Sequence, residues 1–385
     1  MSRVLVIGGA GFIGSNTSLR LVKEGYDVTV LDNLDPGTHK TGKPPHNIIS
    51  AVEDNYLRFV QDTLFNTEVL VEELKKADYV FHLAAFQDYK NQFSTYVKAN
   101  VESTALIYET IVTEKLTNIK RVVVAGSQAV YGEGVYICNC SDREPAAKYP
   151  RPRKEVNLSL GIYDPECPSC GKFLKCPDKA WSLDMLYCVP TSIYSLSKRQ
   201  QVDTALFLGE KYNIETVALN YSIVQGPWQS PYNLYSGLLR NVIVADIHKV
   251  NPVLFEDGGQ LRDYVHIDDV VDANIAALKL ESFKAYNVCG KEQVTNWTYT
   301  QNILRELGSK LEPELPGYYR VGDTKNALSR SSTNLFKPHR SISQMIKDTI
   351  NWYDNYVETK SLPNPKDVLN KMLETGTVQK VNKYK

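Results

Sequence analysis

The sequence lacks the features that would direct a protein to nucleic acid or to a membrane. Lysine plus arginine equal aspartate plus glutamate at 44 each in 385 residues, so no net charge attracts nucleic acid or an anionic lipid surface. No apolar stretch reaches the roughly 20 residues that a membrane-spanning helix needs. The apolar run 4–7 is broken by glycines at once, so we expect a buried first strand there rather than a signal peptide. We expect a soluble, cytoplasmic protein with no nucleic-acid or membrane partner.

Internal repeats and low-complexity tracts are also missing, and the hydrophobic pattern is that of a globular protein. In the first 130 residues, short apolar runs alternate with longer amphipathic stretches. The pattern predicts strands at 3–7, 27–31, 57–60, 79–83 and 119–125, and helices at 12–24, 67–76 and 91–114. Such alternation is typical of parallel strands joined by crossover helices, so we expect a Rossmann-type, doubly wound α/β sheet.

The pattern stops after Gly132 and resumes near residue 191. The later part predicts helices at 191–212, 268–281, 296–308 and 341–357, strands at 215–219 and 285–288, and an irregular region up to about 262. We therefore expect four parts. They are a Rossmann domain (1–132 and 191–225), a Cys-rich insertion (133–190), a smaller C-terminal substrate-binding α/β region (226–357) that returns some elements to the first domain, and a tail (358–385) with one short helix near 365–374.

A glycine-rich string lies where the first predicted strand gives way to the first helix. Gly8 permits the tight turn, Gly11 lets the backbone approach a pyrophosphate, and Gly14 allows close packing of helix on strand. Phe12 and Ile13 open the helix whose N-terminus would face the phosphates. Asp32 ends the second strand, at the distance needed to accept both ribose hydroxyls of a dinucleotide.

The residues after Asp32 favour NAD over NADP. Asn33 follows, and no arginine stands nearby to receive a 2′-phosphate. Asp62, just after the strand 57–60, either hydrogen-bonds the adenine amino group or caps the following turn; the sequence leaves both open.

Tyr194 and Lys198 are four residues apart on one helical face, which places the ammonium beside the phenol and favours its ionised form. A tyrosine with a reference pKa of about 10 is a poor base near neutral pH, so this neighbour matters. Ser127 ends the strand 119–125, on the edge where doubly wound sheets bind ligands. The three residues predict an enzyme that oxidises and re-reduces a substrate hydroxyl.

These motifs together resemble the extended short-chain dehydrogenase/reductase family, in its NAD-dependent sugar-nucleotide epimerase/dehydratase branch, over residues 3–355. In order, they are Gly8 to Gly14, Asp32-Asn33, His82-Leu83-Ala84-Ala85, Asn100-Val101, Gly126 to Gly132, Tyr194 with Lys198, Gly226-Pro227, and Arg262 to Asp269.

The resemblance implies a role for each matching residue. Tyr194 is the general base, Lys198 binds the nicotinamide ribose, and Ser127 orients the reacting hydroxyl. The implied NAD-binding residues also include Leu83, Ala84, Ala85 and Asn100. The implied residues for a nucleoside-diphosphate sugar are Gln87, Ser127, Gln128, Asn220, Arg262 and Arg320, with the two arginines on its phosphates. His82 more simply packs at a strand end. The family also implies a homodimer through helices 91–114 and 191–212.

Two positions separate the reactions within this family. Sugar 4,6-dehydratases carry an Asp-Glu pair directly after the serine or threonine, whereas this chain has Gln128 and Ala129, which cannot supply acid or base. The sequence therefore favours a 4-epimerase. It resembles most the NDP-L-rhamnose 4-epimerase-like group, in the stretch Asp32 to Pro36, in Tyr131 to Gly134 and in a Cys-Pro-x-Cys-Gly insertion before the catalytic tyrosine. An NAD-dependent oxidoreductase or dehydratase-like enzyme on a similar sugar is the alternative, and a non-catalytic NAD-binding protein is a minor one. Ile223 replaces an asparagine that usually touches the substrate, which leaves the sugar and the nucleotide open.

Six of the seven cysteines lie within 133–190. In a chain without a secretory signal, they indicate free thiols or a metal site rather than disulfides. The two close pairs are Cys138 with Cys140 and Cys167 with Cys170, and the second resembles a zinc-ribbon knuckle. Four thiolates would form a closed, structural zinc site. The tight Cys-x-Cys spacing and the further cysteines Cys176 and Cys188 leave a metal-free loop equally open. In both cases we expect the insertion to cover the substrate pocket.

Overall fold

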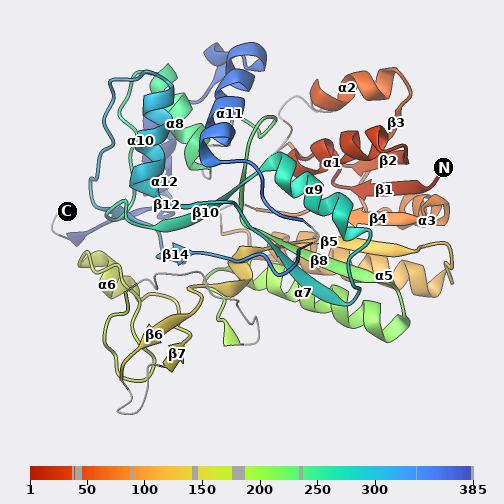
Figure 1. Ribbon diagram of the computed structural model, residues 1–385, viewed down its shortest axis with the longest axis horizontal. Helices are drawn as coiled ribbons and strands as arrows, with labels where there is room; N and C mark the ends of the chain where they lie inside the picture. The colour runs from red at the N-terminus through yellow and green to blue at the C-terminus, as the bar shows by residue number, and fades with distance from the viewer. Residues whose placement is uncertain are drawn as a thin grey trace.

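The computed structural model describes residues 1–36, 39, 46–87, 91–140, 146–175, 187–233, 237–334 and 336–382. Its main feature is a seven-stranded sheet (Figure 1). In order across the sheet, the strands are β11 (Lys284–Val288), β8 (Thr216–Tyr221), β5 (Arg121–Ser127), β4 (Tyr79–His82), β1 (Arg3–Ile7), β2 (Asp27–Asp32) and β3 (Leu57–Gln61).

All neighbouring strands of this sheet are parallel, so their carboxyl ends share one edge. The chain runs outward from β1 to β3 and then crosses back to β4 on the other side of β1. The order reverses between β1 and β4, and ligands of doubly wound sheets bind at such a switch point. The predicted Rossmann-type fold is confirmed.

The strands are apolar on both faces, which explains why helices cover both. Val4 and Val6 of β1 belong to one buried cluster, whereas Leu5 and Ile7 belong to a second one. Successive side chains of a strand point to opposite faces, so each cluster lies under its own helical layer. One layer comprises α1 (Phe12–Lys23), α2 (His46–Glu53) and α9 (Ile267–Ala277) (Figure 1).

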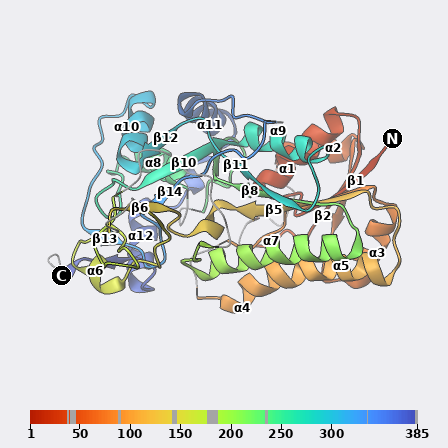
Figure 2. The same cartoon turned by 60° about the horizontal axis from the view of Figure 1, so that its bottom comes forward.

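In the opposite layer, the helices predicted at 91–114 and 191–212 lie side by side (Figure 2). Its elements are α3 (Thr67–Lys76), α4 (Phe93–Tyr96), the π-helical segment η1 (Val97–Glu102), α5 (Ser103–Thr113) and α7 (Ile193–Tyr212). Among the described residues, no helix is both long and apolar enough to cross a bilayer.

A second region packs beyond the carboxyl edge of the sheet (Figure 1). Its small sheet has the order β12 (Gln293–Thr295), β10 (Leu261–His266) and β14 (Asn326–Ala327), with β9 (Ile223–Gln225) paired to β10. Its helices are α8 (Leu238–Ile247), α10 (Asn296–Glu306), α11 (Ile342–Tyr356) and α12 (Pro365–Glu374). Helices α8, α10 and α11 enclose a separate apolar cluster that includes Leu239, Tyr299 and Met345.

The prediction of an irregular region up to residue 262 is wrong for α8. This helix carries Val242, Ile243 and Val244 in succession, and all three are buried. A helix that is apolar on most sides shows no amphipathic period, and β-branched residues favour strands in isolation. Packing against α10 and α11 therefore decides the helix.

The insertion and the C-terminal segment are both folded against this second region. The insertion contains the hairpin β6 (Tyr136–Cys138) with β7 (Ala146–Lys148) and the short helix α6 (Glu155–Ser159). The C-terminal segment contains the turn η4 (Thr359–Ser361), α12 at the predicted place, and β15 (Gln379–Lys380). Strand β15 pairs with β13 (Tyr318–Tyr319).

Candidate active site

The glycine loop between β1 and α1 allows no side chain at two positions. Gly8 has φ +78°, and a Cβ there would lie 2.4 Å from the backbone nitrogen of Ala84. A Cβ on Gly14 would lie 2.1 Å from the carbonyl oxygen of Gly8. Both distances are too short for any carbon, so these glycines allow the close approach of β1, β4 and α1.

Gly11 differs, because its added Cβ would meet only the Gly8 carbonyl oxygen, at 3.3 Å. It is the N-cap of α1 and makes no side-chain cap, and Phe12 and Ile13 after it are partly exposed. The N–H groups of the first turn thus have no side-chain acceptor at the cap, at the switch point of the sheet. This arrangement fits the pyrophosphate of a dinucleotide.

Asp32, at the end of β2, organises the loop that surrounds it. Its carboxylate accepts hydrogen bonds from the backbone nitrogens of Ala10 (3.0 Å) and Leu34 (2.9 Å). His39 lies 4.0 Å from it, a neighbour that the sequence did not predict. Asn33 is exposed and accepts a bond from the backbone of Asp35. The carboxylate remains where a ribose would meet the glycine loop.

Asp62 caps the turn before α3. Its Oδ1 accepts from the backbone nitrogen of Thr63 (2.7 Å), and its Oδ2 accepts from the side chain of Asn66 (3.0 Å). Of the two predicted roles, this geometry favours the cap, and the adenine contact stays a prediction.

The end of β4 lies directly beside the glycine loop. The backbone nitrogens of Leu83 and Ala84 both donate to the carbonyl of Ile7 at 2.9 Å, and Ala85 after them is exposed. The predicted run Leu83 to Ala85 therefore leaves the sheet at the switch point, on the side of the predicted cofactor.

Asn100, within the π-helical segment η1, is fully buried and ties the β4 loop to α7. Its amide exchanges bonds with the backbone of Phe86 (2.9 and 3.2 Å) and donates to the hydroxyl of Ser197 (2.9 Å). Short π-helical segments recur at functional sites because they reorient one side chain. Here Asn100 supports the helix that carries Tyr194 and Lys198. Gln87 follows the same loop and is exposed.

Ser127 is the last residue of β5 and begins the 3-10 turn η2 (Gln128–Tyr131). Its hydroxyl accepts a bond from the backbone nitrogen of Ala129 at 3.2 Å. Gln128 follows it, and the side-chain oxygen of Gln128 is buried with no hydrogen-bond donor among the described residues. A hydroxyl group of a ligand would satisfy that oxygen.

Helix α7 carries the predicted Tyr-Lys pair. Ser192 caps it, with a reciprocal bond to Ser195, so the helix begins at Ile193, directly before Tyr194. Tyr194 is partly buried in the first turn. The helix packs on β5 and on η2, which brings the predicted base and Ser127 to the same edge of the sheet.

Lys198 lies fully within the protein, one turn further along α7. Its Nζ donates to the carbonyl of Ala125 and to the side chain of Gln201, both at 2.6 Å. Because no carboxylate among the described residues pairs with it, burial lowers the pKa of Lys198 to about 7. The bond to Ala125 fixes the ammonium two residues before Ser127 on β5.

His82 is not a catalytic histidine. It is fully buried at the end of β4, with Nε2 near the hydroxyls of Ser103 (3.1 Å) and Thr104 (3.0 Å). Burial, together with the nearby charge of Lys198, lowers the pKa of His82 to about 3. The ring stays neutral and packs the strand end, as predicted.

Arg262, on β10, is turned toward a loop of its own chain. Its guanidinium donates to the carbonyls of Thr324 (2.9 Å) and Lys325 (3.1 Å) and to the carboxylate of Asp323 (3.2 Å). These bonds fix its orientation. A contact with a substrate phosphate stays a prediction for this residue.

Arg320 begins the same loop. Its guanidinium lies 5.1 Å above the ring of Phe255, a cation–π contact. Burial raises the pKa of Asp323, but the charges of Arg262 and Arg320 outweigh it and hold that pKa below its ordinary value. The structure thus brings the two predicted arginines together around one carboxylate.

Asn220, on β8, is fully buried, and its side chain donates to the hydroxyl of Tyr131 at 3.1 Å. Tyr131 in turn donates to Asn287 on β11. These contacts attach Tyr131, the last residue of η2, to β8 and β11. They give Asn220 an internal role, and its contact with a substrate stays a prediction.

The two cysteine pairs lie together, although neither is bonded as a disulfide. The sulfurs of Cys138 and Cys170 are 3.7 Å apart, those of Cys140 and Cys167 are 3.9 Å apart, and all four fall within 4.8 Å of one another. Cys188 is buried elsewhere, and Cys176 lies outside the described residues. The predicted set of four is therefore assembled.

Sequence reasoning missed one local partner and one distant pair. Gln201 binds Lys198 from one turn away, and the i,i+3 spacing was visible. Arg153 and Glu133 are buried together in the insertion, 20 residues apart within an aperiodic segment. No local pattern indicated that pair.

Comparison with known proteins agrees with this geometry. The profile of the "NAD dependent epimerase/dehydratase family" matches residues 4–154 and 170–289. The dTDP-L-rhamnose 4-epimerase of Burkholderia thailandensis is 29% identical over 375 residues, which are 93% of this chain and 97% of that protein. The structure of the UDP-N-acetylglucosamine 4-epimerase from Methanobrevibacter ruminantium has a TM-score of 0.66 at 26% identity, covering 92% of this chain and 98% of that one.

The structure of the UDP-glucuronic acid 4-epimerase from Bacillus cereus in complex with NAD has a TM-score of 0.71 at 22% identity, covering 92% of this chain and all of that one, and shows the shared fold. The predicted resemblance is confirmed. The profile matches well over half of this chain, which therefore belongs to the NAD-dependent epimerase/dehydratase family.

Proposed function

We propose that the protein is an NAD-dependent nucleotide-sugar epimerase that inverts carbon 4 through a transient 4-keto intermediate. The observation that carries the proposal is one edge of the sheet that joins Ser127, Tyr194 and Lys198 with no carboxylate at positions 128 and 129. Dehydration would need an acid and a base beside the sugar, whereas epimerisation needs only oxidation, rotation of the ketone and reduction from the other face.

Each of the three residues has one task in this mechanism. Tyr194 accepts the proton of the C4 hydroxyl and later returns it. Ser127 hydrogen-bonds that hydroxyl and orients it. Lys198 holds a positive charge one helical turn from Tyr194, which favours the phenolate. When bound at the glycine loop, NAD would take up the hydride from C4 and give it back.

The substrate's diphosphate would lie against Arg262 and Arg320, and its sugar against Gln128, with Gln87 and Asn220 as further predicted contacts. The buried side-chain oxygen of Gln128 supports this placement, because it lacks a donor among the described residues. Two guanidinium groups around one loop suit a pyrophosphate, which offers oxygens to both.

A panel of UDP-, dTDP- and GDP-sugars tests the reaction. Each is incubated with the purified protein without added cofactor, and NMR reads the configuration at carbon 4. We expect inversion of one or more sugars and NAD retained through purification. Loss of water would indicate a dehydratase, and a need for added NAD would indicate a one-way oxidoreductase. Retained NAD with no change in any sugar would favour a non-catalytic protein.

We also propose that Cys138, Cys140, Cys167 and Cys170 bind one structural Zn²⁺. A tetrahedral ion with Zn–S bonds of about 2.3 Å requires sulfurs about 3.8 Å apart, close to both measured pairs. Burial raises the pKa of Cys167, but the backbone N–H groups of Ser169 and Cys170 point at its sulfur, and the net effect lowers the pKa to about 6. A thiolate there is ready for a metal, as the predicted reducing cytoplasm allows.

Metal analysis of the purified protein tests this site. We expect one zinc per chain, and its loss in Cys167→Ser. Cys289→Ser is the matched control, because Cys289 is also buried but lies outside the cluster. A full complement of zinc in Cys167→Ser would contradict the assignment.

We propose that two copies pair through α4, η1, α5 and α7. These helices lie side by side and expose large apolar side chains, namely Phe93, Val97, Leu196 and Phe207. A second copy of the same face would bury them in a four-helix interface. Light scattering should report a dimer for the wild type and a monomer for Phe207→Glu. A monomeric wild type would refute the pairing.

A further inference from the structure

Arg153, in the insertion, is buried and joins four separate segments of the chain. Its side chain is 2% exposed, and its Nε lies 3.0 Å from the carboxylate of Glu133. Its Nη1 donates to Glu256 (2.9 Å) and to the carbonyl of Tyr163 (3.0 Å), and its Nη2 donates to the carbonyl of Asp323 (2.8 Å). Such a convergence of contacts fixes the side chain completely.

The loop 320–325 runs between Arg153 and Arg262. Arg153 binds the carbonyl of Asp323, and Arg262 binds the next two carbonyls, those of Thr324 and Lys325. Three successive backbone carbonyls therefore accept bonds from two guanidinium groups. The backbone of this loop cannot shift without breaking one set of bonds.

Further bonds hold the ends of the loop to the same cluster. The second carboxylate oxygen of Glu133 accepts from the backbone nitrogen of Lys325 at 2.9 Å, and the ammonium of Lys325 binds Asp257. The backbone nitrogen of Glu256 donates to the carbonyl of Tyr318, two residues before Arg320. Glu133 thus supports one end of the loop through its carboxylate, and Glu256 supports the residues before the other end through its backbone nitrogen.

The loop also touches the start of the catalytic helix. Gly322 has φ +83°, and a Cβ there would lie 3.0 Å from the carbonyl of Thr191 and 3.5 Å from the Cβ of Ser192. Ser192 is the N-cap of α7, two residues before Tyr194. The loop therefore fills the space between the buried arginine and the proposed active site.

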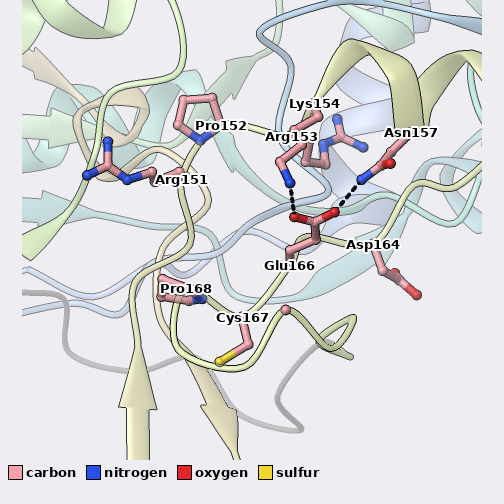
Figure 3. Close-up of a pocket in the computed structure, with 10 residues that line it drawn as sticks. Arg151, Pro152, Arg153, Lys154, Asn157, Asp164, Glu166, Cys167 and Pro168 are labelled. Carbon is pink, nitrogen blue, oxygen red and sulfur yellow. Dashed lines mark hydrogen bonds and ion pairs between the residues drawn. The ribbon is translucent and has the colours of Figure 1, made fainter.

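The insertion anchors Arg153 from its outer side. Next to it, Lys154 and Asn157 both donate to the carboxylate of Glu166, at 2.5 and 2.7 Å (Figure 3). Glu166 directly precedes Cys167 of the cysteine cluster. Lys154, Asn157 and Glu166 line a cavity of about 320 Å³ between α6 and the cysteine knuckle. The knuckle, α6 and Arg153 are thereby linked.

We propose that Arg153 is a positioning residue for the diphosphate site: it holds the loop 320–325, and through it Arg320 and Arg262, in the geometry that binds the substrate. The proposal rests on the proposed function, since it assigns the phosphates of a nucleoside-diphosphate sugar to these two arginines. The insertion then contributes to substrate affinity although Arg153 itself contacts only protein.

The test compares the holoenzymes of the wild type and Arg153→Lys, which keeps the charge but loses the planar fork. Hydrogen exchange is followed in peptides that span 318–327, and calorimetry measures binding of UDP, dTDP and GDP. We expect faster exchange in this segment and about 10-fold weaker binding of the nucleotide that the wild type prefers. The KM for the nucleotide sugar should rise by a similar factor, while kcat and retained NAD stay within about twofold.

Arg121→Lys is the matched control. Arg121 is also buried and also binds a carboxylate and two backbone carbonyls, those of Glu215, Ala277 and Leu280, but it begins β5 at the opposite edge of the sheet. This variant should lose stability without any change in KM or in exchange at 318–327. A double variant, Arg153→Gln with Glu256→Gln, removes one charge of each sign and replaces Arg153→Lys in case that protein does not fold.

Unchanged exchange and unchanged nucleotide affinity in folded Arg153→Lys would overturn the proposal, as would an equal loss in Arg121→Lys. A wild type that binds none of the three nucleotides and epimerises no sugar would instead overturn the proposed function. In that case faster exchange at 318–327 would still show that Arg153 orders the loop, so the two failures are distinguishable.

Discussion

The proposed cofactor side and the proposed substrate side of this protein are built in different ways. The cofactor side depends on backbone packing within a short stretch, since Gly8 and Gly14 allow contacts that no side chain permits. The substrate side depends on charged side chains from distant segments, joined around Arg153 and Arg262. The first should therefore tolerate almost no added volume, and the second should respond to changes in charge and geometry.

The largest expected effect concerns Tyr194, where the two sides meet. Tyr194→Phe removes the proposed base and should lower kcat by about 10²- to 10⁴-fold, with NAD retained and nucleotide affinity unchanged. NMR of the sugar product and the absorbance of retained cofactor measure these effects. Turnover at the wild-type rate would show that another group takes the proton.

Two glycine variants test the cofactor side. Gly14→Ala places a carbon 2.1 Å from the Gly8 carbonyl, so it should both destabilise the fold, by roughly 1–3 kcal/mol or more, and abolish NAD retention. Gly11→Ala meets only one atom at 3.3 Å, so it should weaken NAD binding while the unfolding midpoint stays near that of the wild type. If both variants destabilised the fold equally, Gly11 would be a packing residue like Gly14 and not a position that admits the phosphates.

Lys198→Met tests the buried ammonium through the pH dependence of stability. The pKa of Lys198 falls from 10.5 to about 7 on burial, so between these values the unfolded chain binds a proton that the folded chain does not. The charged form of Lys198 therefore destabilises the folded wild type most below pH 7. This destabilisation decreases as the pH rises toward 10.5. Catalysis should be lost in Lys198→Met.

Denaturant unfolding without NAD, at about pH 6 and about pH 9, measures that dependence. The stability of Lys198→Met relative to wild type should be greater at the lower pH, by on the order of a few kcal/mol. A relative stability that does not change with pH would mean that the ammonium is as well solvated in the folded protein as in the unfolded chain.

The smallest expected effect lies on the substrate side, in the C-terminal segment. Val381 is fully buried in a cluster with Leu158 of the insertion and Tyr319, the residue before Arg320. Val381→Ala should cost roughly 1–3 kcal/mol of stability and raise the KM for the nucleotide sugar a few-fold. Val28→Ala, in an equally buried position on β2, should cost similar stability with no change in KM. If Val381→Ala had the KM of the wild type, the C-terminal segment would have no part in substrate binding.

Much of the fold was predictable because its patterns are local. The strand 3–7 and the helix 67–76 agree with the structure to the residue, since each combines a clear period with flanking turn residues. The helix α8 was missed because it is apolar on most sides, and the π-helical segment around Asn100 was missed because its hydrogen bonds leave no mark on the period. Both are decided by neighbours distant in the chain.

In the candidate site, too, some features were predictable from local spacing and others depend on distant residues. The positions of Tyr194, Lys198 and Ser127 followed from helical spacing and from the rule that ligands bind at strand ends. The partners of Asp32, Asp62 and Arg262 were not predictable, since hydrogen bonds depend on atoms within about 3.5 Å rather than on residue spacing.

The sequence by itself determined the parallel sheet, the glycine loop, the Tyr-Lys helix and the grouping of cysteines, because each is written in residues close together along the chain. Only the tertiary structure decided that the insertion and the C-terminal strand meet at the loop of Arg320. Arg153 reaches Glu256 across 103 residues and Asp323 across 170, and such pairs form only once the second region has packed beyond the carboxyl edge of the sheet. Once buried, each charge is stable only beside its partner, and the spacing of residues along the sequence does not show which partner that is.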